Sequence, residues 1–66
     1  MKWKTTVVTT RDDMYVAMAQ VNNMRKNTGA RIGLMETWMW NQCHPDDQVR
    51  TINRFVIYQE ERVERS

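Results

Sequence analysis

The order of apolar and polar positions divides the chain into three strand-like segments and one helical segment. Residues 2–10 mix threonine and lysine with tryptophan and valine, and this β-branched and aromatic content favours a strand. In residues 30–40 and 49–60, apolar side chains recur at alternate positions, which is the period of a strand. Residues 14–24 instead carry apolar side chains at spacings of three and four, which is the period of an α-helix.

The predicted helix has signals at both ends. Its apolar stripe comprises Met14, Ala17, Met18, Val21 and Met24. Before the stripe, Thr10 and Asp13 stand three residues apart, which is a variant of the capping box in which Thr10 caps the helix. After the stripe, Gly29 suits the left-handed position that ends a helix, and Arg25 and Lys26 fall in the last turn, where cations are favoured.

The chain after residue 40 has two interpretations. Residues 41–47 carry asparagine, proline and aspartate, which favour a loop or a single helical turn between the second and third strands. Alternatively, residues 45–53 form a short helix with the proline at its first position and two aspartates in its first turn. Residues 60–66 are mostly charged and are predicted to fray.

Together these elements predict an α+β fold made of one small domain, residues 1–66, in the order β-α-β-β. We expect an antiparallel three-stranded sheet with one helix packed on one face. In this arrangement Gly33 lets the helix approach the sheet closely. Methionines from both elements then fill the core: Met14, Met18 and Met24 from the helix, Met35 and Met39 from the second strand.

The predicted sheet has more apolar surface than one helix covers. If the methionine face of the second strand packs on the helix, the opposite face stays open; the opposite assignment leaves Met35 and Met39 uncovered. That open face carries Ile32, Leu34, Trp38 and Trp40, with Arg50 and Arg54 of the third strand at its rim. An uncovered apolar face on so short a chain predicts a partner protein or a second copy of the chain. We therefore expect a protein-interaction module that forms a homo-oligomer and covers a partner surface, through this face or through an exposed strand edge. It would act as an adaptor or inhibitor of the kind that viruses and mobile elements encode.

The sequence contains few groups in patterns typical of catalysis. The length of 66 residues excludes a two-domain enzyme. Cys43, His44, Asp46 and Asp47 form the densest set of possible metal ligands. The chain has no second cysteine or histidine to complete a zinc site, so we interpret this set as a solvated loop. Both glycines stand alone, which excludes a glycine-rich phosphate loop. We expect no enzyme activity, no metal and no cofactor.

The cysteine content and the hydropathy pattern bear on location. The single cysteine excludes an intramolecular disulfide and favours a reducing compartment. No apolar stretch has the length of an export signal or a membrane span. We therefore expect a cytoplasmic protein without a membrane partner.

Nucleic-acid binding is the main alternative function. Basic residues interleaved with aromatic side chains on a sheet can hold a single strand by phosphate contacts and base stacking. The residues concerned are Lys2, Lys4, Arg31, Arg50, Arg54 and Tyr58. The pairing register of the strands decides whether these residues meet in one patch. We rank this function below protein binding because the formal net charge is only +2.

The β-α-β-β order, the length and the tryptophan-bearing second strand resemble the dodecin type of small flavin-binding oligomer. The resemblance implies a further alternative function, in which Trp38 or Trp40 stacks on a planar ligand across an oligomer axis. It is a resemblance of architecture, and no sequence motif assigns flavin-binding residues to this chain.

Overall fold

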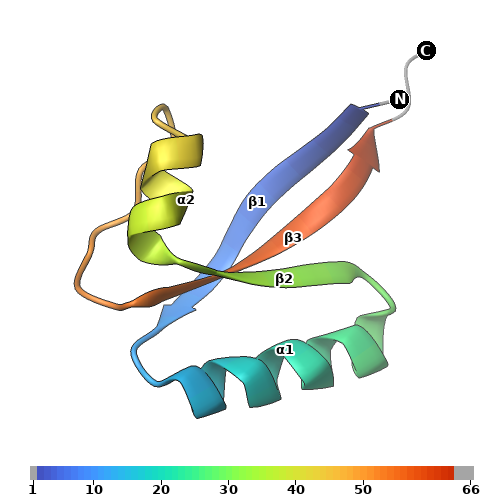
Figure 1. Cartoon of the computed structure of the whole chain (residues 1–66). Helices are drawn as coiled ribbons and strands as arrows, with labels where there is room; N and C mark the ends of the chain where they lie inside the picture. Colours follow the sequence, from blue (N-terminus) through green and yellow to red (C-terminus); the bar gives the residue numbers. More distant parts are fainter. Residues whose placement is uncertain (1, 64–66) are drawn as a thin grey trace.

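The computed structural model describes residues 2–63, which form three strands and two helices (Figure 1). In chain order the elements are β1 (Lys2–Arg11), α1 (Met14–Thr28), β2 (Arg31–Glu36), α2 (Thr37–Cys43) and β3 (Phe55–Val63). The strands form one sheet in the order β1-β3-β2, and β3 runs antiparallel to both neighbours. The predicted α+β class with an antiparallel three-stranded sheet is confirmed, with α2 as an additional helix.

The second strand is shorter than predicted, because β2 ends at Glu36 and the chain continues as α2. The prediction of one strand over residues 30–40 is therefore wrong, and the two tryptophans of this segment lie on a helix. Two hydrogen bonds fix the change of direction: the Thr37 backbone N–H donates to the Arg54 carbonyl oxygen at 2.8 Å, and the Thr37 hydroxyl donates to the Asn53 carbonyl oxygen at 2.6 Å. They hold the start of α2 against the chain that precedes β3.

The chain between α2 and β3 is a loop, so the alternative of a helix over residues 45–53 is wrong. A pair of hydrogen bonds holds the loop against α2. Asn41 Nδ2 donates to the Val49 carbonyl oxygen at 2.8 Å, and Asn41 Oδ1 accepts the Val49 N–H at 2.7 Å. The third strand consequently begins at Phe55 and not at residue 49. Of the predicted frayed tail, residues 60–63 belong to β3, and the rest lies outside the described residues.

Helix α1 ends as predicted but begins with a different cap. Gly29 follows the helix with φ of 69°, in the left-handed region, and the last turn carries the two predicted cations. At the other end, Asp13 Oδ1 accepts the backbone N–H groups two and three residues further along, at 2.8 and 3.2 Å. The predicted cap, Thr10, has another role, because its hydroxyl accepts Asn53 Nδ2 at 2.7 Å.

Replacing Asp13 with alanine is expected to lower the free energy of unfolding by about 1 kcal/mol, because two N–H groups of the first turn lose their acceptor. Urea denaturation followed by circular dichroism measures the loss. Asp12→Ala is the matched control, since it removes a neighbouring carboxylate that makes no cap hydrogen bond. Equal losses in the two variants would contradict the assignment of the cap.

The hydrophobic core lies between α1 and the sheet. Its buried members are Ala17 and Val21 of α1, Ile32 of β2 and Ile57 of β3. Leu34 packs against this cluster, so of the two assignments that the sequence leaves open, the face of Ile32 and Leu34 meets α1, and not the face of Gly33 and Met35. The predicted methionine core is wrong at three positions, because Met14, Met18 and Met39 are 40–52% exposed. The shorter apolar side chains at the middle of α1 make the core instead.

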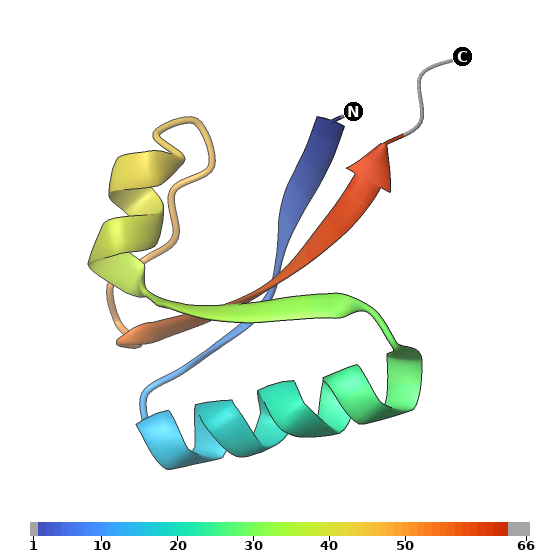
Figure 2. The same cartoon turned by 45° about the vertical axis from the view of Figure 1, so that its right-hand side comes forward.

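The other face of the sheet is covered at one end by α2. Trp40 of α2 is fully buried; its indole stacks on His44 with ring centroids 3.8 Å apart and lies 5.7 Å from the Tyr58 ring of β3. The Tyr58 ring lies over Gly33 of β2, where a Cβ would overlap it. In both Figure 1 and Figure 2, α1 and α2 lie on opposite sides of β2, and the far ends of β1 and β3 extend beyond both helices. Gly33 therefore makes room for an aromatic ring and not for the helix.

Candidate interaction surface

The structure separates the residues predicted to anchor a partner. Ile32 is 4% exposed beneath α1, and Trp40 is fully buried beneath α2. The prediction of one exposed sheet face that holds both side chains is therefore wrong. Leu34 is half-buried at the margin of the core. Trp38 points to the opposite side of α2 from Trp40 and is 55% exposed, so it remains available to a partner.

The basic residues of the alternative function do not form one patch. The predicted set divides into Lys2, Lys4 and Arg31 near the end of β3, Arg50 and Arg54 in the loop before it, and Tyr58 between the two groups. Arg31 is engaged within the sheet, where its guanidinium lies 4.6 Å from the Trp3 ring centroid and its Nε donates to Glu60 Oε2 at 3.3 Å. The sequence leaves open whether the basic residues meet in one patch. The strand register shows that they do not, because it places the two groups at opposite ends of β3.

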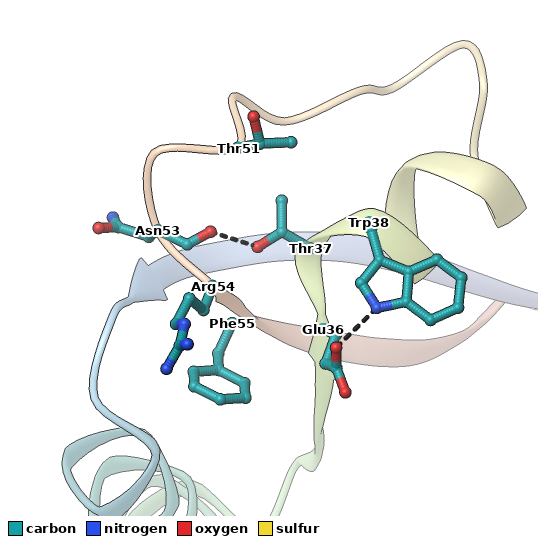
Figure 3. A pocket seen from close by; sticks show the side chains of 7 residues that line it. All are labelled: Glu36, Thr37, Trp38, Thr51, Asn53, Arg54 and Phe55. Carbon is teal, nitrogen blue, oxygen red and sulfur yellow. Dashed lines mark hydrogen bonds between the residues drawn. The ribbon is translucent and has the colours of Figure 1, made fainter.

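A hollow of about 460 Å³ lies where β2 turns into α2, and we refer to it as the α2 pocket. Its lining residues are Glu36, Thr37, Trp38, Thr51, Asn53, Arg54 and Phe55 (Figure 3). Thr37, one of these lining residues, donates its two hydrogen bonds to Asn53 and Arg54, which also line the hollow. Because β2, α2, the loop and β3 are joined there, the pocket has a framework that is fixed by the fold.

Charged and aromatic groups occupy the two sides of the α2 pocket. On one side, Trp38 Nε1 donates to Glu36 Oε2 at 2.6 Å, which orients the exposed indole. On the other side, Figure 3 shows the Arg54 side chain beside the Phe55 ring. Within residues 2–63, the Arg54 guanidinium has no hydrogen bond or ion pair. It is therefore available to bind a carboxylate of a partner, next to two aromatic surfaces.

A second hollow of about 310 Å³ adjoins the first along the outer strand, and we refer to it as the edge groove. It is lined by Met14 of α1, Leu34, Met35 and Glu36 of β2, Met39 of α2 and Phe55 of β3. The two hollows share Glu36 and Phe55. All the lining residues of the edge groove except Glu36 are apolar, so the surface around the end of β2 combines an apolar part with a charged part.

More large apolar side chains are exposed than buried in the described part of the chain. The buried apolar residues are Ala17, Val21, Ile32, Trp40, Val56 and Ile57. The exposed ones are Trp3, Val8, Met14, Tyr15, Val16, Met18, Trp38, Met39, Ile52 and Val63. Several of them gather around the two hollows. Contiguous exposed apolar surface on a small protein is typical of an interaction site.

Most of the residues that line the two hollows were not predicted from the sequence. Trp38 and Arg54 belong to the predicted set, but they come together through the helix and the loop and not across a hairpin. Thr37, Asn53 and Phe55 have no distinguishing local signal, because their roles depend on contacts between separate segments. The periodicity of α2 is the one signal that could have placed Trp38 on a helix.

Cys43 and His44 are adjacent in the sequence but have separate environments. Cys43 is exposed at the end of α2, whereas the His44 ring stacks on Trp40 and its Nδ1 lies 3.2 Å from the Trp40 carbonyl oxygen. Residues 2–63 contain no group of three possible metal-ligating side chains. Within the same residues, no helix combines the length and the apolar character needed to cross a membrane.

Comparison of the chain with protein-family models, curated proteins and solved structures found no match. The resemblance to the dodecin type depends on a tryptophan-bearing second strand, and β2 contains no tryptophan. The function is therefore inferred from the geometry of the surface itself.

Proposed function

We propose that the protein is a non-enzymatic protein-interaction module that binds a partner protein through the α2 pocket. The observation that carries this proposal is the exposed indole of Trp38, held by Glu36 across one hollow from the Phe55 ring and the Arg54 guanidinium. Tryptophan and arginine are the residue types most enriched among those that dominate binding energy. The fixed framework behind them reduces the entropy lost on binding.

The partner is expected to present an apolar side chain next to a carboxylate. The apolar group packs between Trp38 and Phe55, and the carboxylate accepts hydrogen bonds from Arg54. Binding covers the partner surface, which is the mode of action of an adaptor or an inhibitor. Nucleic acid is the less supported ligand, because Arg54 lies at the opposite end of β3 from Lys2 and Lys4.

Replacing Trp38 with alanine is expected to weaken partner binding about 30-fold, which corresponds to about 2 kcal/mol, and Arg54→Ala is expected to weaken it about 10-fold. The partner is recovered on the immobilised wild-type chain and identified, and the affinity of each variant for the purified partner is measured by calorimetry. Circular dichroism verifies that each variant is folded.

Tyr15→Ala is the matched control, because Tyr15 is an aromatic residue 86% exposed on α1 and lines neither hollow. Its affinity is expected to equal that of the wild type. Unchanged binding by Trp38→Ala would overturn the proposal. So would a recovered ligand that proves to be nucleic acid with an affinity that falls steeply with salt concentration.

A further inference from the structure

In the described part of the chain, the outer edge of β2 presents backbone groups that pair with no other strand. Strand β2 pairs with β3 on one side only. The Ile32 carbonyl oxygen accepts Nε and Nη2 of Arg25 at 2.8 and 2.6 Å, so this carbonyl points away from β3. In an antiparallel strand, the N–H and C=O of one residue point to the same side, and every second residue repeats that direction. The backbone groups of Leu34 and the N–H of Glu36 therefore also point to the open edge.

The free part of this edge is short and lies between two protected ends. Arg25 occupies the Ile32 carbonyl at one end, and α2 begins directly after Glu36 at the other. Between them, the Leu34 N–H and C=O have no hydrogen-bond partner within residues 2–63. The apolar edge groove lies beside the same segment. An open strand edge with apolar surroundings is a template for pairing with another strand.

We infer that a second copy of this chain occupies the edge, with the two β2 strands antiparallel and centred on Leu34. The Leu34 N–H of each copy then donates to the Leu34 carbonyl oxygen of the other, and two three-stranded sheets become one continuous sheet. This inference goes beyond the α2 pocket, and its test uses the purified chain alone.

Charge complementarity identifies a second copy as the occupant. With Leu34 opposite itself, Glu36 of one copy lies opposite Ile32 of the other. Glu36, Leu34 and Ile32 alternate along β2 and share the face on which α1 lies. The Glu36 carboxylate of one copy therefore lies beside the Arg25 guanidinium of the other copy, which donates to the Ile32 carbonyl oxygen there. The two-fold axis produces this ion pair twice, as an isologous interface requires.

The side chains on the opposite face are also compatible with this register. Met35 of one copy lies across from Gly33 of the other, where the Tyr58 ring covers the glycine, so a flexible thioether side chain meets an aromatic surface. The walls of the edge groove, Met14 and Met39, lie beside this junction. Pairing therefore covers apolar surface that the single chain leaves exposed.

The first test removes the backbone donor without changing the side chain. The full chain of 66 residues is short enough for chemical synthesis with N-methyl-leucine at position 34. Sedimentation equilibrium is expected to show a dimer for the wild type, and N-methylation is expected to raise its dissociation constant about 30-fold, since two hydrogen bonds and the close strand approach are lost. N-methylation at Gln48, an exposed loop position, is the matched control and leaves the dimer intact.

The second test exchanges the charges of the ion pair. Glu36→Arg and Arg25→Glu each place like charges together in their own dimer, so each variant alone is expected to dissociate. An equimolar mixture of the two restores both ion pairs and is expected to form a heterodimer. A wild-type chain that is monomeric up to millimolar concentration, or a dimer that is insensitive to these changes, would overturn the inference, as would an edge that binds only an unrelated extended peptide.

Discussion

Replacement of Trp40 by alanine is expected to unfold the chain at room temperature. The indole is fully buried between α2 and the sheet, stacks on His44, contacts the Tyr58 ring and donates Nε1–H to the Asp47 carbonyl oxygen at 2.9 Å. Truncation of a buried tryptophan costs about 3–5 kcal/mol. The core of a domain of this size rarely supplies more than about 3–5 kcal/mol in total. Near-ultraviolet circular dichroism and a urea titration measure the loss of the fold.

Trp38→Ala is the matched control for this variant. It removes the same side chain two residues earlier in the same helix, but from an exposed position. Its unfolding transition is expected to stay close to that of the wild type. A cooperative transition of normal midpoint in Trp40→Ala would show that α2 does not depend on this anchor, and it would contradict the packing described for the second sheet face.

Replacement of Gly33 by alanine is expected to lower the free energy of unfolding by about 1–3 kcal/mol. The backbone of Gly33 is not in the left-handed region, so the cost arises from space. The added Cβ would overlap the end of the Tyr58 ring, including Cε1 at 2.7 Å. That ring has little freedom to move, because it lies against buried Trp40. Urea denaturation of the single variant measures the loss.

A double-mutant cycle tests whether the Tyr58 ring causes this loss. Tyr58→Leu removes the ring atoms that the new Cβ would meet, so Gly33→Ala should cost much less in that background. Gly29→Ala is the control: its cost arises from the positive φ of 69° with open space around it, and it should be the same with either residue at position 58. Equal costs of Gly33→Ala in both backgrounds would contradict the steric explanation.

The parts of the fold that were predictable from sequence are those with local causes. Helix α1 has an apolar stripe, cations in its last turn and Gly29 after it, and all of these act within a few residues of one another. The strand content of β1 is likewise a property of its own residues. The helix cap at Asp13 instead of Thr10 was harder to predict from sequence, because the Thr10 hydroxyl accepts a hydrogen bond from Asn53, which is far away in the chain.

The segment after β2 shows why alternation was misleading. Trp38 and Trp40 stand two residues apart and continue the strand pattern of Ile32 and Leu34. The same segment also has the spacing of a helix. Its buried and half-buried side chains recur three and four residues apart, at Thr37, Trp40, Asn41 and His44. Both periods fit so short a stretch. The hydrogen bond from Thr37 to a residue 16 positions away favours the helix, and no local pattern contains it.

The candidate surface was predictable only in its residue types. Exposed tryptophan and arginine were expected at a partner interface; Trp38 and Arg54 both line the α2 pocket, and their binding role stays a prediction. The face of β2 that meets α1 was not predictable, because both faces of the strand carry apolar residues. The buried positions on α1, Ala17 and Val21, accept the branched side chain of Ile32, whereas the longer methionines lie at the margin.

The strand order β1-β3-β2 has a consequence for biosynthesis. The middle strand is the last of the described elements to be translated, and it is the strand with which both β1 and β2 pair. While residues 55–63 are still inside the ribosome, the emerging chain has no sheet, and α1 has no complete surface on which to pack. The sheet is therefore expected to form only after residues 55–63 have left the ribosome, because it depends on contacts between residues far apart in sequence.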